Sequence, residues 1–145
     1  MAELRSTGAP AITITTKYLA SSTPSLPGLV LQVTQLVDSY MLWVGISDGG
    51  PDDIERVASQ GSLCKDWAVA MPPRPPAKEA SGTSLFRPAS SDVALSMAQR
   101  LARRFKKQIF LSVDMPAAIV GFGQGQMLLL DAERGIIERL KELES

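Results

Sequence analysis

Two apolar segments separated by a very short turn lie in the first half of the chain. Residues 29–37 read LVLQVTQLV and residues 40–47 read YMLWVGIS, with only Asp38 and Ser39 between them. Runs of this length that are rich in β-branched and aromatic residues are typical of strands, and two such runs joined by two residues are typical of a β-hairpin. Residues 40–47 are apolar almost throughout, which indicates a strand buried on both faces. We therefore expect a sheet built around this hairpin.

Other apolar runs of strand length predict four more strands. They lie at residues 11–18, 64–72, 108–113 and 126–131. Their β-branched and aromatic residues, and the short alternating pattern in several of them, favour strands over helices. Within residues 64–72, Ala68 and Ala70 share one face of the strand, so a neighbouring element can approach this face closely.

Apolar residues three or four positions apart predict a helix over residues 91–105 and a shorter helix after residue 131. The predicted order of strands and helices is therefore ββββαββα. Consecutive strands with short connections favour antiparallel pairing. We predict an α+β fold in which a single six-stranded, mainly antiparallel sheet carries both helices on one face. The length fits a single domain over residues 1–145, with long loops near 48–62 and 72–90.

The second face of this sheet has no predicted cover, although its strands carry apolar side chains on both faces. An apolar sheet face of this kind marks a surface that another protein buries. We therefore predict that a partner protein covers it. The candidate partner-binding residues are Val30, Leu36, Leu42, Val44 and Phe110.

The composition excludes several classes of function. The chain has no histidine, so Ser-His-Asp and Cys-His catalysis and histidine metal sites are excluded, and its one cysteine cannot form an internal disulfide or a zinc cage. No carboxylates are paired by a motif. We therefore expect no enzyme activity, no cofactor and no metal. No apolar run is long enough for a membrane span and no signal-peptide core is visible, so we expect no membrane partner and a cytoplasmic protein in a reducing compartment.

Positive charge is concentrated in the middle of a chain whose net charge is zero. Residues 71–112 carry eight basic and two acidic residues, a net +6, and the rest is acidic. The densest cluster consists of Arg100, Arg103, Arg104, Lys106 and Lys107. It has two open interpretations: a solvated helix end that offsets the helix dipole, or a docking patch for an acidic surface. Nucleic acid is not an expected partner, because the total charge is neutral and no aromatic residues are interleaved for base stacking.

Three short motifs have ordinary structural interpretations. The glycines of GFGQG at residues 121–125 resemble a phosphate-binding loop, but a strand is predicted to follow, so we expect a hairpin loop. The acidic residues between 48 and 55 lack the spacing of a calcium-binding loop, so we expect a solvated loop. The prolines of residues 72–76 favour an extended linker.

Several segments together resemble the proteasome assembly chaperone 4 family. The most similar segment runs through Ala98-Gln99-Arg100-Leu101-Ala102-Arg103-Arg104 and then Lys107-Gln108-Ile109-Phe110-Leu111-Ser112. The strand segments Leu42-Trp43-Val44-Gly45 and Trp67-Ala68-Val69-Ala70-Met71, and Thr83-Ser84-Leu85 ahead of the helix, also resemble this family. The order and spacing agree from about residue 29 to 145, whereas residues 1–28 match weakly.

This resemblance implies a non-enzymatic chaperone with a sheet and two helices. The implied partner is a similar subunit, proteasome assembly chaperone 3, with which the chain forms a heterodimer. The pair is expected to hold α-type subunits of the 20S proteasome while the α-ring forms, in the cytoplasm and, as an open alternative, the nucleus. The basic cluster of Arg100 to Lys107 is then the candidate client-binding patch.

Two other functions remain open from the residues alone. The first is a small-ligand or regulatory domain that homodimerises through its sheet. The second is an enzyme that uses carboxylates or Lys65, for which a deep pocket with convergent polar groups would be the mark.

Overall fold

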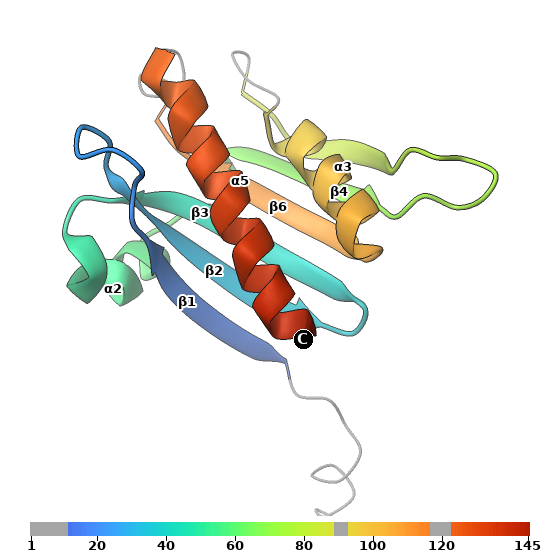
Figure 1. The fold of residues 1–145 in the computed structure, drawn as a ribbon, viewed down its shortest axis with the longest axis horizontal. Coiled ribbons are helices and arrows are strands. Elements are labelled where there is room, and N and C mark those ends of the chain that lie inside the picture. The colour runs from blue at the N-terminus through green and yellow to red at the C-terminus, as the bar shows by residue number, and fades with distance from the viewer. Residues whose placement is uncertain (1–11, 89–92, 117–122) are drawn as a thin grey trace, which may run out of the picture.

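A mixed six-stranded sheet lies at the centre of the fold, in a computed structural model that describes residues 12–88, 93–116 and 123–145 (Figure 1). The strands are β1 (Thr13–Leu19), β2 (Gly28–Leu36), β3 (Ser39–Ser47), β4 (Asp66–Met71), β5 (Ser81–Phe86) and β6 (Gln108–Asp114). Their order across the sheet is β1-β2-β3-β6-β4-β5. Neighbouring strands pair antiparallel except β3 and β6, which are parallel.

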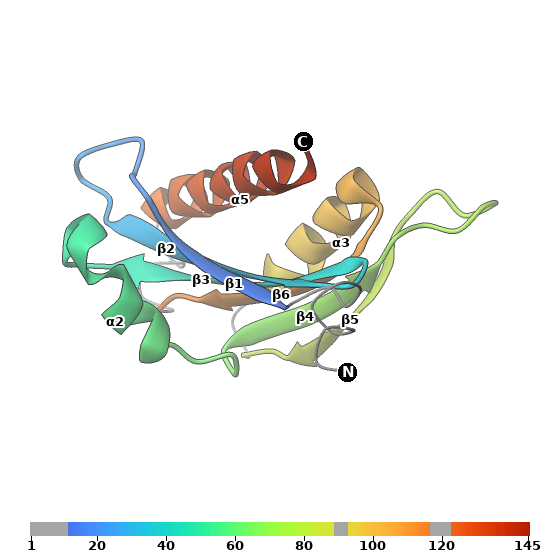
Figure 2. The same cartoon turned by 90° about the horizontal axis from the view of Figure 1, so that it is seen from below.

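Helices lie on both sides of this sheet. The two long helices, α3 (Val93–Phe105) and α5 (Gly123–Glu144), lie on one face (Figure 2). A short 3₁₀ turn, η1 (Gly50–Asp53), leads into α2 (Ile54–Ser59), which lies on the opposite side near the β1–β3 end (Figure 2). The predicted α+β fold, with six mainly antiparallel strands and two helices on one face, is confirmed, and α2 is an addition to it.

The predicted hairpin is present as β2 and β3. Leu36 pairs with Ser39, so the turn consists of Val37 and Asp38, one residue earlier than predicted. Asp38 has a positive φ of 54°, a conformation that aspartate tolerates better than most residues. The register pairs Val33 with Leu42, which places both side chains on the same face of the sheet.

Two predicted elements are wrong. Residues 126–131 are not a strand but part of α5, because Leu128, Ala132 and Ile136 recur at four-residue spacing and are completely buried. The expected hairpin loop over 121–125 is therefore also wrong: Gly123 to Gly125 begin the helix, and residues 121 and 122 lie outside the described residues. The sixth strand is β5, within the region expected to be the loop 72–90.

Small residues allow α3 to lie close to the sheet. Ala68 and Ala70 of β4 are completely buried, and so are three alanines on the sheet-facing side of the helix, Ala94, Ala98 and Ala102. The neighbouring Gly82 of β5 shows how little space remains: an added Cβ would lie 2.9 Å from the Val69 carbonyl oxygen and 3.1 Å from Leu95 Cδ1. The predicted close approach at the alanine face is thus occupied by α3.

A polar contact fixes the C-terminal end of α5 to the sheet. The hydroxyl of Tyr40, a buried residue of β3, donates a hydrogen bond of 2.9 Å to Glu144 Oε2, and Lys107 Nζ lies 3.4 Å from the same oxygen. Burial and, secondarily, the adjacent Glu144 carboxylate raise the pKa of Tyr40 to about 12. Because the native state holds this proton more tightly than an unfolded chain does, the contact stabilises the fold at neutral pH.

Enlarging Ala70 should disturb the α3 contact. We expect Ala70→Leu to lower the free energy of unfolding by about 1–3 kcal/mol, because the added atoms must displace the helix. The control is Met71→Leu, which changes a half-exposed side chain on the other face and should cost less than about 1 kcal/mol. Urea unfolding measures both variants; equal stabilities would contradict the tight packing inferred at Ala70.

The Tyr40 contact predicts a specific pH dependence. Tyr40→Phe should lower the free energy of unfolding by about 1–2 kcal/mol at neutral pH. The ordinary pKa of 10.0 and the raised value of about 12 set the window: the contribution is complete below pH 10 and is lost as the pH rises through 12. Denaturant unfolding from neutral to alkaline pH should show the two proteins converging over this range, and a constant difference would count against the contact.

Candidate functional site

The sheet face opposite α3 and α5 carries a continuous row of apolar side chains. Strand register places Met41 of β3 beside Phe110 of β6, and Phe110 beside Val69 of β4. Their strand neighbours Leu42, Leu111 and Ala68 belong to the core beneath the helices, so these three side chains point the other way. We call this surface the open face. Its apolar residues are Ile14, Leu36, Met41, Trp67, Val69, Met71, Phe86 and Phe110.

Much of the open face is accessible to solvent. Ile14 is 60% exposed, Phe86 49% and Met71 43%, while Met41, Val69 and Phe110 are half-buried in the middle of the row. The described helices cover only the end where α2 lies. Large apolar side chains that remain partly or largely exposed along one sheet face are characteristic of a protein-binding surface.

At the α2 end, a hydrogen-bond network fixes residues 61–63 over the sheet. Asp114 Oδ2 accepts hydrogen bonds from the Ser62 backbone N–H (2.8 Å) and from Trp43 Nε1–H (3.2 Å). The Trp43 indole N–H also lies 3.3 Å from the Ser62 carbonyl oxygen. The segment passes so close that a Cβ added to Gly61 would overlap the indole. Trp43 is therefore buried and held in one orientation.

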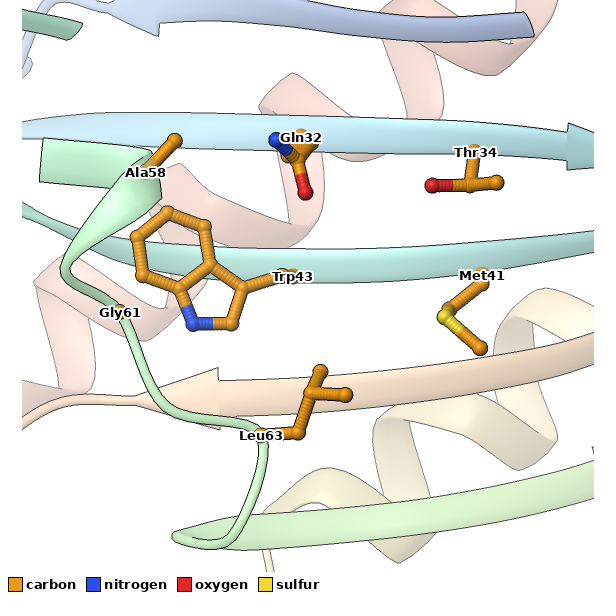
Figure 3. A pocket seen from close by; sticks show the side chains of 7 residues that line it. All are labelled: Gln32, Thr34, Met41, Trp43, Ala58, Gly61 and Leu63. Carbon is orange, nitrogen blue, oxygen red and sulfur yellow. The ribbon is translucent and has the colours of Figure 1, made fainter. Parts of the chain in front are cut away.

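A pocket of about 190 Å³ lies between this segment and the sheet (Figure 3). In Figure 3 the Trp43 indole lies beside Gly61, with Met41 further along β3. The lining residues are Gln32, Thr34, Met41, Trp43, Ala58, Gly61 and Leu63. None of them is ionisable, so the pocket offers apolar contact and a few neutral hydrogen-bond partners. Such a lining suits a side chain of another protein better than acid–base chemistry.

The five predicted partner-binding residues do not all lie on one surface of the structure. Phe110 and Leu36 lie on the open face and are half-buried. Val30 lies on the same face but is completely buried at the end that α2 covers, so it offers no surface. The assignment of Leu42 and Val44 to the uncovered face is wrong, because both are completely buried in the core beneath the helices.

The residues that the sequence reasoning missed carried a usable signal. With a two-residue turn, Leu31 pairs with Val44 and Val33 with Leu42, so these four share a face, and Met41 must lie on the other. Val69 and Met71 alternate with the buried alanines of β4 and fall on the open face for the same reason. Ile14 and Phe86 lie on edge strands, where the sequence pattern alone does not tell which face is covered.

The predicted basic cluster is divided between ion pairs and free cations. Arg100 makes two hydrogen bonds to the Glu133 carboxylate, at 2.9 and 2.7 Å, and Lys107 pairs with Glu144 at 3.4 Å. The bonds to Glu133 raise the pKa of Arg100 above its ordinary value. Arg103, Arg104 and Lys106 are exposed and form no ion pair within the described part of the chain. They lie at the α3 end, not on the open face.

Two kinds of feature are absent from the residues that the structure describes. Within them, no group of three or more histidine, cysteine, aspartate or glutamate side chains is arranged to hold a metal ion. No helix in the same residues combines the length and the apolar character that a membrane crossing requires.

The Asp114 network predicts a spectroscopic change. In a Trp67→Phe background, where Trp43 is the only tryptophan, Asp114→Ala should release residues 61–63 and expose the indole. We expect a red-shifted emission and stronger acrylamide quenching, with a loss of stability of about 1.5–3 kcal/mol. Asp114→Asn keeps an acceptor oxygen and should retain most of the native emission. Identical spectra for Asp114→Ala and the parent would show that the network does not hold the segment.

Comparison with known proteins supports the sequence resemblance. The model of the family described as proteasome assembly chaperone 4 matches residues 28–115, which is more than half of the chain and runs from β2 to just beyond β6. No curated protein matches the sequence. The fold is similar to a chain in the crystal structure of a novel chaperone complex for yeast 20S proteasome assembly, at 16% identity and a TM-score of 0.59, over 92% of this chain and 95% of that one. The chain belongs to the proteasome assembly chaperone 4 family.

Proposed function

We propose that this chain is a non-enzymatic assembly chaperone that pairs with a second, similar chaperone through its open face. The pair holds α-type subunits of the 20S proteasome during α-ring assembly. The observation that carries the proposal is the row of Met41, Phe110 and Val69 across the centre of the open face, in a chain of this family.

The open face is built to gain free energy from a partner. Full burial of an exposed Met, Val or Phe side chain contributes about 1.5–3 kcal/mol. These three are half-buried on adjacent strands, so a partner gains only the part of this free energy that belongs to their remaining exposed surface. Exposed apolar residues at this density are costly for a monomer in water. A partner that covers their remaining surface gains this free energy, reduced by the entropy that the two proteins lose on association.

The shape of the face favours a partner with a sheet of its own. Two sheets pack face to face at about 10 Å with their side chains interdigitated, and no helix of the described residues lies over β6, β4 and β5 on the open face. The pocket beside Trp43 lies at the edge of this area and offers a site for one projecting side chain. A structurally similar chaperone, as the family resemblance implies, meets both requirements.

Client binding then falls to surfaces that the partner leaves free. The free cations of the basic cluster, Arg103, Arg104 and Lys106, belong to the end of α3 and the residue that follows it, and α3 lies on the side of the sheet opposite the open face (Figure 2). Charged interfaces contribute orientation and association rate more than affinity. This property suits a chaperone that must release its α-type subunit as assembly proceeds.

The pairing proposal is tested by placing a charge in the row. Phe110→Asp and Val69→Asp should each weaken partner binding by at least about thirtyfold, equivalent to about 2 kcal/mol, because a carboxylate would be buried in the interface. Leu130→Asp is the matched control: Leu130 is 59% exposed on α5, on the helix side, and its replacement should leave pairing unchanged.

The measurement is affinity purification of each tagged variant from cells, followed by mass spectrometry. We expect the wild-type chain and Leu130→Asp to retain one similar-sized chaperone and α-type subunits, and the two row variants to lose the chaperone. Circular dichroism checks that each variant is folded. Recovery of a stable homodimer without proteasome subunits would support the regulatory-domain alternative and reject the proposal.

A further inference from the structure

The connection between β4 and β5 projects from the body of the molecule as an arm. Residues 72–80 follow Met71 directly and extend beyond the sheet beside the C-terminal half of α3 (Figures 1 and 2). A tight turn lies within the arm, where the Ala77 N–H donates a 2.8 Å hydrogen bond to the Arg74 carbonyl oxygen. Arg74 and Lys78 are exposed and form no ion pair in the described residues.

The base of the arm is fixed to α3. Gln99 Nε2 donates a hydrogen bond of 3.1 Å to the Ala80 carbonyl oxygen. Between the arm and the helix lies a cleft of about 280 Å³, lined by Glu79, Ala80, Ser96, Gln99, Arg100 and Arg103. The cleft therefore lies between the arm and Arg103, one of the free cations of α3.

Ion pairs within the chain leave only some cations of this region available to a ligand. Arg100 and Lys107 are occupied by Glu133 and Glu144 from α5. Arg103, Arg104 and Lys106 remain free at the α3 end, where Lys106 adopts a positive φ of 57° as the helix ends. The arm adds Arg74 and Lys78. Among the described residues, the arm and the end of α3 thus carry five free cations, of which Arg103 lines the cleft together with the exposed carboxylate of Glu79.

We propose that the arm and the end of α3 form one binding surface for an acidic segment of a partner protein. Its cations are Arg74, Lys78, Arg103, Arg104 and Lys106. An acidic side chain of the partner enters the cleft, where Arg103 supplies charge and Gln99 and Ser96 supply neutral hydrogen-bonding groups. The chemistry of this surface is independent of pairing, but its assignment to an α-type client rests on the proposed function.

The arm is suited to this task by its proline content. Four prolines in residues 72–76 restrict the backbone before binding, so less conformational entropy is lost when the arm is ordered against a partner. A flexible arm of the same length would reduce the gain from its two cations. The prolines thus restrict the positions of Arg74 and Lys78 before a partner binds.

The exposed carboxylate of Glu79 favours a protein ligand over a nucleic-acid ligand at this surface. A nucleic-acid backbone carries a negative charge at every nucleotide and would place some of them near this carboxylate. An acidic peptide can place a neutral residue there instead. In addition, Phe105, the aromatic residue at this end of α3, is partly buried and lies 6.0 Å from the Arg104 guanidinium, so it is not a free stacking platform.

The test uses the full chain and a fluorescent peptide in which glutamate alternates with serine. Two probes serve as comparisons: the same peptide with lysine for glutamate, and single-stranded oligothymidylate. Arg74→Glu/Lys78→Glu and Arg103→Glu/Arg104→Glu should each weaken binding of the acidic peptide by about tenfold or more at low ionic strength. Lys65→Glu is the control, since Lys65 is exposed at the opposite end of β4 from the arm, and it should retain native affinity.

Physiological salt should reduce both the affinity and the difference between variants, because the Debye length falls to about 8 Å. Each variant is first shown to be folded by thermal unfolding. The proposal is overturned if the arm variant binds the acidic peptide as the control does, if no peptide binding is detected, or if oligothymidylate binds more tightly than the peptide. The last result would assign the surface to nucleic acid.

Co-purification separates this proposal from the proposed function. If the chain acts as a chaperone but the surface is wrongly assigned, the arm variant recovers α-type subunits normally while Phe110→Asp loses its partner. If the proteasome role is wrong but the surface is correct, α-type subunits are absent throughout and peptide binding still depends on Arg74, Lys78, Arg103 and Arg104.

Discussion

The position of β6 between β3 and β4 determines the rest of the structure. The strands β1 to β3 form one antiparallel unit and β4 and β5 another, and within the sheet these units meet only through β6. The side chains of β6 alternate between the two faces of the sheet: Ile109 and Leu111 are completely buried beneath the helices, while Phe110 lies on the open face. β5 and β6 are each antiparallel to β4 and therefore run in the same direction, so the chain must return along the sheet between them, and α3 makes this return.

The two faces of the sheet are closed by different means. Under α3, the alanines of β4 and of the helix leave room for close packing, so this face is completed within the chain. On the other face, α2 and the segment held by Asp114 cover Trp43 and Val30 but extend no further. The fold therefore has a core of its own and still presents large apolar side chains. This combination distinguishes an interface from a defect in packing.

Local pattern predicted those elements whose contacts are close in sequence. The β2–β3 hairpin and α3 were predicted because a short turn and a regular apolar stripe are local signals. The start of α5 was not, because the apolar run of residues 127–130 fits a strand as well as a buried helix turn. β5 was missed because an exposed edge strand needs few apolar residues.

Leu42 and Val44 were assigned to the wrong face although the hairpin register places them with Leu31 and Val33. The free cations could not be identified, because Glu133 lies 33 residues from Arg100.

The two candidate surfaces meet at β4. Val69 and Met71 face the open side, and the chain passes from Met71 directly into the arm. A partner that covers Met71 would therefore contact the residues that orient Arg74. Met71 adjoins both surfaces, whereas Phe110 of β6 belongs only to the open face and Arg103 of α3 only to the cationic surface. Separate effects at Phe110 and Arg103 would show that pairing and acid binding are distinct properties of one sheet and its attached helix.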